Sequence, residues 1–200
     1  MLNSPMIYQT YLKVFSPEEC QRIQERAHQE EMEKGKVGGE AHAETGVLKD
    51  SIRDSNNYYF GESWVFQRLQ QIVLQANTDL KWNLDVQSIE PLQFTEYTGG
   101  GFYNWHVDAH GWPYGPDTDF PGMVRKMSFS VLMNDPDEYT GGELEVDSGW
   151  NDNENLKEII KLKGIGDMVI FHSLLPHRVR PVTQGIRKSL VGWVVGPTYK

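Results

Sequence analysis

Short apolar runs separated by turn-forming residues fill the chain from residue 82 onward. Glycine, proline, aspartate and asparagine stand between the runs, a spacing typical of β-sandwiches and barrels. Such a pattern leaves little room for a helical or parallel α/β fold. The runs predict eight strands, at residues 88–97, 102–108, 125–134, 142–147, 157–162, 167–171, 176–181 and 187–195.

Two helices are predicted ahead of this β-rich part. Ser16, Pro17 and Glu19 combine a capping serine, a first-turn proline and a glutamate three residues after the cap, so a helix should run from there to about residue 33. Apolar residues at helical spacing predict a second helix over residues 62–77.

The remaining N-terminal segments are a strand within residues 5–15 and a glycine-containing polar loop at 34–57. The sequence therefore predicts a mostly β protein with N-terminal helices, in which a jelly-roll (double-stranded β-helix) core is buttressed by two or more helices. We expect one domain over residues 1–200, with a helical part at 1–87 and the jelly roll at 88–196.

Composition excludes several classes of partner. The formal net charge of −9 offers no basic field for nucleic acid. No apolar segment approaches the length of a membrane span, and the N-terminus lacks the pattern of a signal peptide. Cys20 is the only cysteine, so no internal disulfide can form and a reducing compartment is expected. These features predict a cytoplasmic protein, and they specify no oligomeric state.

A histidine and a carboxylate, His106 and Asp108, lie two residues apart at the end of a predicted strand. Side chains two apart on a strand leave the same face, so this strand can offer a metal ion an imidazole nitrogen and a carboxylate oxygen. His-x-Asp is also common by chance, and the alternative is a surface histidine beside a solvated aspartate. A third ligand from elsewhere in the chain would decide between the two.

Two histidines can supply that ligand. Two histidines and one carboxylate leave coordination positions open on one side of a metal, as in non-haem Fe(II) oxygenases. His172 ends an apolar strand, where a core or rim histidine would also fit, whereas His177 opens the next strand with Val179 on its own face. The spacing favours His177 but leaves His172 open.

The last predicted strand places Arg187, Ser189, Val191 and Trp193 on one face. An inward arginine and serine are costly without a partner, and a guanidinium beside a hydroxyl suits a carboxylate. The pattern therefore predicts an anchor for an anionic small molecule inside the barrel. The alternative is an arginine at a sheet edge, paired with one of the acids of the protein.

Three motifs together resemble a known family. They are Tyr97-x-x-Gly-x-x-Tyr103-x-x-His106-x-Asp108, the run from Ser128 to Leu144, and the run from His177 to Arg187. In this order and spacing, over residues 88–196, they resemble the Fe(II)- and 2-oxoglutarate-dependent dioxygenases of the prolyl 4-hydroxylase type. The last two are most similar to the prolyl/lysyl hydroxylase-like branch of bacteria and viruses.

The resemblance implies roles for named residues. His106, Asp108 and His177 match the iron ligands of the family, and Arg187 stands where the family binds the distal carboxylate of 2-oxoglutarate. Animal and plant members commonly have lysine at the position of Arg187. Cosubstrate contacts are further implied for Tyr97 and Ser189, and substrate contacts for Arg53, Tyr103, Trp112 and Trp193.

The implied activity is hydroxylation of an unactivated C–H bond, coupled to decarboxylation of 2-oxoglutarate to succinate and CO2. The cofactors would be Fe(II), 2-oxoglutarate and O2, with ascorbate as a further candidate. The resemblance favours a prolyl residue of a peptide or protein as substrate; a free amino acid or other small molecule is the alternative. A non-catalytic cupin-like binding module is a second alternative. In the loop at 111–122, Trp112 and Tyr114 could stack on a proline ring or simply close the loop.

Overall fold

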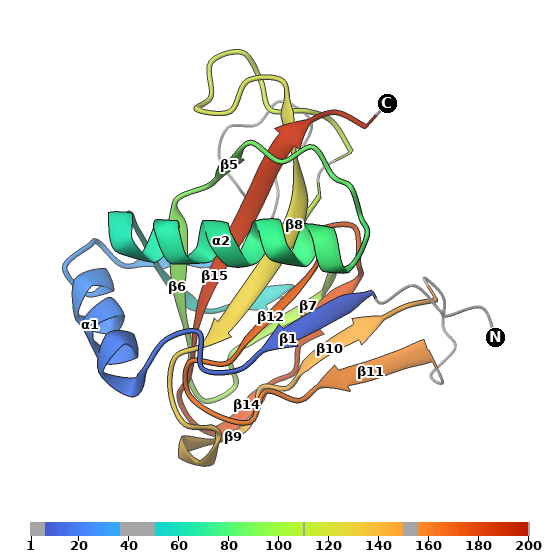
Figure 1. Ribbon diagram of the computed structural model, residues 1–200. Coiled ribbons are helices and arrows are strands. Elements are labelled where there is room, and N and C mark those ends of the chain that lie inside the picture. Colours follow the sequence, from blue (N-terminus) through green and yellow to red (C-terminus); the bar gives the residue numbers. More distant parts are fainter. Residues whose placement is uncertain (1–6, 37–50, 110, 150–155, 200) are drawn as a thin grey trace.

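The computed structural model describes residues 7–36, 51–109, 111–149 and 156–199, and these form two antiparallel sheets flanked by helices (Figure 1). The larger sheet has the order β1 (Tyr8–Tyr11), β12 (Met168–His172), β8 (Met123–Leu132), β15 (Arg187–Pro197), β6 (Leu92–Tyr97), β4 (Asn56–Phe60) and β2 (Glu33–Lys34), with β5 (Ser88–Ile89) also paired to β15.

The smaller sheet has the order β11 (Lys157–Ile160), β10 (Leu144–Asp147), β13 (His177–Val179), β7 (Phe102–His106) and β3 (Arg53–Asp54). A short ribbon of β9 (Tyr139–Gly141) and β14 (Val182–Gly185) follows the 3-10 turn η1 (Pro136–Glu138). From β6 to β15, leaving out the β9–β14 ribbon, the chain crosses between the two sheets at every step except the β10–β11 hairpin, which is the strand arrangement of a jelly roll. The predicted fold class is confirmed.

Two helices support the larger sheet. Helix α2 (Ser63–Asp79) crosses β15 and β8 in Figure 1 and buries Val65, Leu69, Val73 and Ala76. Helix α1 (Pro17–Ala27) begins with the predicted capping box, in which Ser16 and Glu19 bond to each other's backbone N–H groups. Its buried face is also the predicted one, comprising Cys20, Ile23 and Ala27. No helix in the described ranges is long and apolar enough to cross a membrane.

Several boundaries differ from the sequence prediction. Helix α1 ends at Ala27 rather than near residue 33. The predicted loop at 34–57 contains β3 and the start of β4, because Arg53 and Asn57 pair with Tyr103 and Thr95 of neighbouring strands. Such long-range pairing leaves no local periodicity to detect. Residues 37–50 of that loop lie outside the described residues.

The predicted strand 88–97 is divided into β5 and β6 at Glu90 and Pro91. Proline has no N–H to donate to a ladder, so an interruption at this position is expected. Glu90 lies at this division: its N–H donates to the Trp193 carbonyl of β15 at 2.9 Å, and its carboxylate forms an ion pair with Arg125, described below.

The core has two parts. One lies between the helices and the larger sheet, and the other contains Tyr97, Val146, Val169, Phe171 and Val179 from both sheets. A pocket opens beside the second part. It is lined by Arg53, Gln93, Tyr97, Tyr103, His106, Asp108, Phe129, Ser130, Leu144, Phe171, His177, Val179, Arg187, Ser189, Val191 and Trp193.

Candidate functional site

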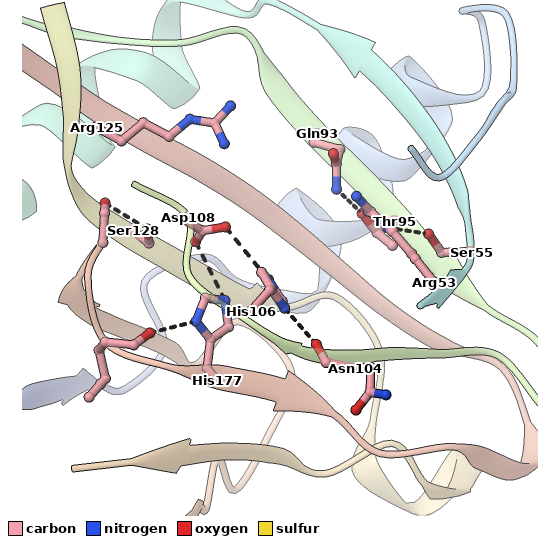
Figure 2. A network of polar contacts seen from close by, with 12 residues as sticks. Arg53, Ser55, Gln93, Thr95, Asn104, His106, Asp108, Arg125, Ser128 and His177 are labelled. Carbon is pink, nitrogen blue, oxygen red and sulfur yellow. Dashed lines mark hydrogen bonds and ion pairs between the residues drawn. The ribbon is translucent and has the colours of Figure 1, made fainter. Parts of the chain in front are cut away.

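Two histidines meet across neighbouring strands at the pocket. His106 of β7 is the register partner of His177 of β13, and the ring centroids lie 4.1 Å apart. Directly opposed residues on antiparallel strands bring their side chains within contact distance. Residues far apart in the sequence therefore become one pair by strand pairing alone (Figure 2).

A β-bulge in β7 shapes this wall of the pocket. His106 pairs with His177 and Tyr103 pairs with Val179, so two residues of β7 stand opposite one residue of β13. The extra residue places Tyr103 and His106, which are three apart, on the same face. Their rings stack with centroids 3.4 Å apart and planes 12° apart, which fixes the orientation of the imidazole.

Asp108 completes the cluster from beyond the strand. Strand β7 ends at His106, so the prediction that one strand carries both groups was wrong. Asp108 is instead held by backbone bonds, in which its N–H and that of Ala109 donate to the carbonyl of Ser173 at 3.0 and 2.9 Å. Its carboxylate oxygens lie 3.7 Å from His106 Nε2 and 3.5 Å from His177 Nε2.

Both histidines have a defined tautomer. His106 Nδ1 lies 2.8 Å from the carbonyl oxygen of Asn104, and His177 Nδ1 lies 2.9 Å from that of Leu175. A carbonyl only accepts, so each Nδ1 carries the hydrogen and donates it. Each Nε2 lone pair is then free and points toward Asp108, as ligation by Nε2 requires.

The protonation states also suit a cation. Burial lowers the pKa of His106 to about 3, with a further contribution from His177, so its imidazole is neutral at physiological pH. Burial alone would raise the pKa of Asp108, but His177, His106 and Arg125, together with a hydrogen bond from Ser128, lower it to about 2. The site thus presents a neutral imidazole at His106 and an ionised carboxylate at Asp108, the forms that bind metal.

The three side chains fit a metal ion. One ligand atom from each of His106, Asp108 and His177 lies within 4.8 Å of the others. Two imidazoles and one carboxylate on one side of an ion match the facial arrangement of non-haem Fe(II) sites. His172 takes no part: its Nε2 lies 3.2 Å from the Tyr199 hydroxyl, and its ring packs against Trp82. Of the two histidines that spacing left open, the structure brings His177 into the cluster.

A buried arginine and hydroxyl line the pocket on the facing sheet. Arg187 is 3% exposed, and its Nη1 donates to Ser189 Oγ at 3.2 Å. Tyr97 is the register partner of Arg187, and its ring lies 5.6 Å from the guanidinium carbon. No carboxylate within the described ranges forms an ion pair with Arg187. The predicted inward face of Arg187, Ser189, Val191 and Trp193 does line the pocket.

A second buried arginine, Arg53, stands behind the Tyr103 ring. Its guanidinium carbon lies 4.6 Å from the Tyr103 centroid, so Arg53, Tyr103 and His106 form a stack. Arg53 is 6% exposed and donates to Ser55 Oγ at 2.8 Å (Figure 2). It also donates to Asn57 Oδ1 at 3.1 Å. The family resemblance implied a substrate contact for Arg53, and the structure brings Arg53 into the pocket lining.

A third arginine of the site was not predicted. Arg125 forms a bidentate ion pair with Glu90, at 2.8 Å from Nε and 2.6 Å from Nη2, and its guanidinium carbon lies 3.9 Å from the Trp193 ring centroid. The Tyr114 hydroxyl donates to the same carboxylate at 2.7 Å. In the sequence, Arg125 stands at the end of a predicted strand, and no motif distinguishes it from other surface arginines.

Two predicted substrate residues differ in their placement. Trp193 lines the pocket, and its indole Nε1 is buried without an acceptor among the described residues. Trp112 is 43% exposed and is not among the pocket-lining residues. Tyr114 lies in the same loop as Trp112, and its bond to Glu90 fastens that loop to the larger sheet.

Comparison with known proteins agrees with this geometry. The family model of the 2OG-Fe(II) oxygenase superfamily matches residues 92–195. A PKHD-type hydroxylase of Acidovorax ebreus (strain TPSY) is 33% identical over 159 residues, covering 76% of this chain and 64% of the relative. One from Xylella fastidiosa (strain M12) is 37% identical over 106 residues, covering 52% of this chain and 44% of the relative. The chain thus spans less than two thirds of the length of these relatives.

Solved structures share the fold at lower identity. The viral collagen prolyl hydroxylase from Paramecium Bursaria Chlorella virus-1 aligns with a TM-score of 0.67 and 20% identity, over 98% of this chain and 99% of that one. A prolyl hydroxylase from Trichoplax adhaerens, solved with a peptide fragment of hypoxia inducible factor, aligns with a TM-score of 0.68 and 18% identity, over 96% and 84%.

The chain belongs to the 2OG-Fe(II) oxygenase superfamily. Its cofactors are those of the family: His106, Asp108 and His177 hold Fe(II), and 2-oxoglutarate is the cosubstrate.

Proposed function

We propose that the protein hydroxylates an unactivated C–H bond, and that the bond belongs to a prolyl residue of a peptide or protein. The observation that carries this proposal is that the metal cluster on one sheet and the buried Arg187 on the other line a single pocket. When bound, Fe(II) and 2-oxoglutarate supply oxidation by O2, with release of succinate and CO2.

Arg187 is proposed to anchor the cosubstrate. Its guanidinium is buried without a carboxylate partner in the described part of the chain, and it faces the pocket beside Ser189. A guanidinium fork binds a carboxylate through two parallel hydrogen bonds. The distal carboxylate of 2-oxoglutarate would supply the missing negative charge, with the hydroxyl groups of Ser189 and Tyr97 as further partners.

The rest of the pocket orients the substrate and excludes water. Tyr103 covers one face of the His106 ring, and Trp193 offers its unpaired indole N–H to an acceptor in the pocket. We assign substrate contacts to Arg53, Tyr103 and Trp193, and an outer contact to Trp112 on the loop. Ascorbate would act by keeping the iron reduced rather than by occupying a separate site.

The prolyl substrate is supported by the names of similar proteins. The structural neighbours include prolyl hydroxylases, one of them bound to a peptide, and the curated relatives are PKHD-type hydroxylases. Hydroxylation of a free amino acid or other small molecule is the second candidate, favoured by the small, largely buried pocket. A non-catalytic cupin-like module would not need the buried Arg187 and Ser189 pair.

Succinate release separates the enzyme from the binding module. Protein loaded with Fe(II) is incubated with 2-oxoglutarate, O2 and ascorbate, alone and with panels of prolyl peptides and free amino acids. We expect succinate to form and to increase with the true substrate, whose product gains one oxygen atom by mass. No succinate from any iron-loaded preparation would refute the enzymatic proposal. Product from amino acids alone would refute the prolyl peptide.

A further inference from the structure

We propose that Arg53 is the binding site for a carboxylate of the substrate, so that the protein acts on anionic rather than neutral substrates. The inference rests on the proposed function, because it concerns the substrate of the same pocket. It names a chemical class: a molecule with a carboxylate a few bonds from the carbon to be hydroxylated, either a main-chain carboxylate or the side chain of an adjacent acidic residue.

Arg53 is buried with neutral partners only. Its Nε donates to Ser55 Oγ, its Nη1 to the Lys36 carbonyl oxygen at 3.2 Å, and its Nη2 to Asn57 Oδ1. A guanidinium has five N–H groups, so two are left without an acceptor among the residues that the structure describes. Neutral oxygens satisfy hydrogen bonds but do not offset a buried positive charge. Within the described ranges, no carboxylate forms an ion pair with Arg53.

With Fe(II) and 2-oxoglutarate bound, the charges of the site balance without that of Arg53. Fe(II) and Arg187 together bring three positive charges, and 2-oxoglutarate and Asp108 together bring three negative ones. Asp108 is the only carboxylate among the pocket-lining residues that the structure describes. Arg125 is neutralised by Glu90. Among the residues that the structure describes, the Arg53 charge therefore still lacks a counterion once cofactor and cosubstrate are bound.

The Tyr103 ring covers one face of the Arg53 guanidinium, whose carbon lies 4.6 Å from the ring centroid. This cation–π contact stabilises the cation but supplies no counterion. No carboxylate in the described part of the chain supplies one either, so we infer that the negative charge comes from a ligand.

Arg53 is placed for a group near the reacting carbon. The stack with Tyr103 and His106 sets the guanidinium two layers from a metal ligand, at 4.6 and 3.4 Å between layers. Gly35 packs closely against the same side chain: a Cβ there would lie 2.3 Å from Ser55 Oγ and 2.6 Å from Arg53 Nε. The Arg53 side chain is thus held in place by these contacts and lines the pocket at a fixed position.

Binding of three small probes tests the site without requiring turnover. The protein is loaded with Mn(II) in place of Fe(II) and with 2-oxoglutarate. Calorimetry then measures the affinity for N-acetyl-proline, its neutral amide, and N-acetyl-aspartyl-proline amide. We expect at least one charged probe to bind about ten-fold or more tightly than the neutral amide, as a charge-assisted hydrogen bond provides. The charged probe that binds tighter identifies the source of the carboxylate.

Variants assign the preference to Arg53. Arg53→Gln should bind charged and neutral probes alike, Arg53→Lys should keep part of the preference, and Arg22→Gln, at an exposed arginine of α1, should keep all of it. Equal affinity for all probes, or no saturable binding of any, would overturn the proposal, as would a preference that survives Arg53→Gln. The wild-type comparison stands even if Arg53→Gln does not fold.

Succinate release distinguishes this failure from failure of the proposed function. Wild-type protein that releases succinate but shows no charge preference refutes the carboxylate site alone. Wild-type protein that prefers the charged probe but releases no succinate refutes the proposed reaction and leaves the Arg53 site standing.

Discussion

Two kinds of arginine lie at or near the pocket: one is paired with an acid, and two line the pocket without such a partner in the described residues. Arg125 is held by both oxygens of Glu90 and lies against Trp193, and the same carboxylate accepts a bond from Tyr114. Arg53 and Arg187 donate to neutral groups, and neither forms an ion pair with an acid in the part of the chain that the structure describes. Burying a charge is expensive unless it is paired, so the two arrangements serve different ends.

The comparison distinguishes an arginine that stabilises the fold from two arginines that are available to bind ligands. The Arg125–Glu90 pair is complete before any ligand arrives, and burial, which disfavours its charge, is outweighed by Glu90, so the pKa of Arg125 lies above its usual range. The charges of Arg187 and Arg53 have no counterion within the described ranges, so we infer that ligands supply it. We therefore expect substitutions in the Arg125–Glu90 pair to lower the stability of the protein. Substitutions of Arg187 or Arg53 should instead lower the affinity for ligands.

Glu90→Gln should have the largest effect on stability. It keeps the shape of the side chain but leaves the Arg125 guanidinium buried without its counterion. We expect the free energy of unfolding to fall by about 3–5 kcal/mol, measured by denaturant titration of the metal-free protein. Glu18→Gln, at an exposed glutamate, is the matched control and should change the free energy of unfolding little. A loss below about 1 kcal/mol would show that the pair is not structural.

Arg187→Met should show the opposite behaviour. Methionine replaces the aliphatic stem and removes an uncompensated charge, so the metal-free protein should lose little stability. Affinity for 2-oxoglutarate should fall about 100-fold, which corresponds to the loss of a bidentate charged bond. Arg187→Lys should lose less, since it keeps the charge but not the fork. Unchanged cosubstrate affinity in Arg187→Met would place the anchor elsewhere.

The uncompensated charge of Arg53 also acts on His106, where it adds to the effect of burial and His177 in lowering the pKa to about 3. Between pH 6.5 and about 3, the unfolded chain binds a proton at this histidine that the folded chain does not. The metal-free protein should therefore lose stability as the pH falls, by up to about 1.4 kcal/mol per pH unit from this group. In His106→Gln, the free energy of unfolding should depend less steeply on pH over this range. Parallel curves of stability against pH for the variant and the wild type would contradict this prediction.

Much of the fold was predictable because its signals are local. The capping box at Ser16 and the apolar stripe of α2 are encoded within one or two turns, and both are confirmed. The strands β2 and β3 were missed because they are short and exist through pairing with distant residues. Pro91 marks the break between β5 and β6, although the alternating pattern on both sides predicted one strand over residues 88–97.

The site was predictable where residue type and spacing carry the chemistry. His106, Asp108 and His177 come together as expected, although Asp108 is held by Ser173 rather than by its own strand. The roles assigned to Arg187, Tyr97 and Ser189 remain predictions with supporting geometry. The Arg125–Glu90 pair could not be foreseen, because it depends on which strand ends meet across the barrel.

The most direct test of the account is the iron content of three histidine variants. After reconstitution with Fe(II) under anaerobic conditions, His106→Ala and His177→Ala should hold almost no iron, because each removes one of three ligands. His172→Ala should hold as much as the wild type, since His172 bonds to Tyr199 outside the cluster. Iron retained by the first two variants, or lost only in His172→Ala, would contradict the assignment.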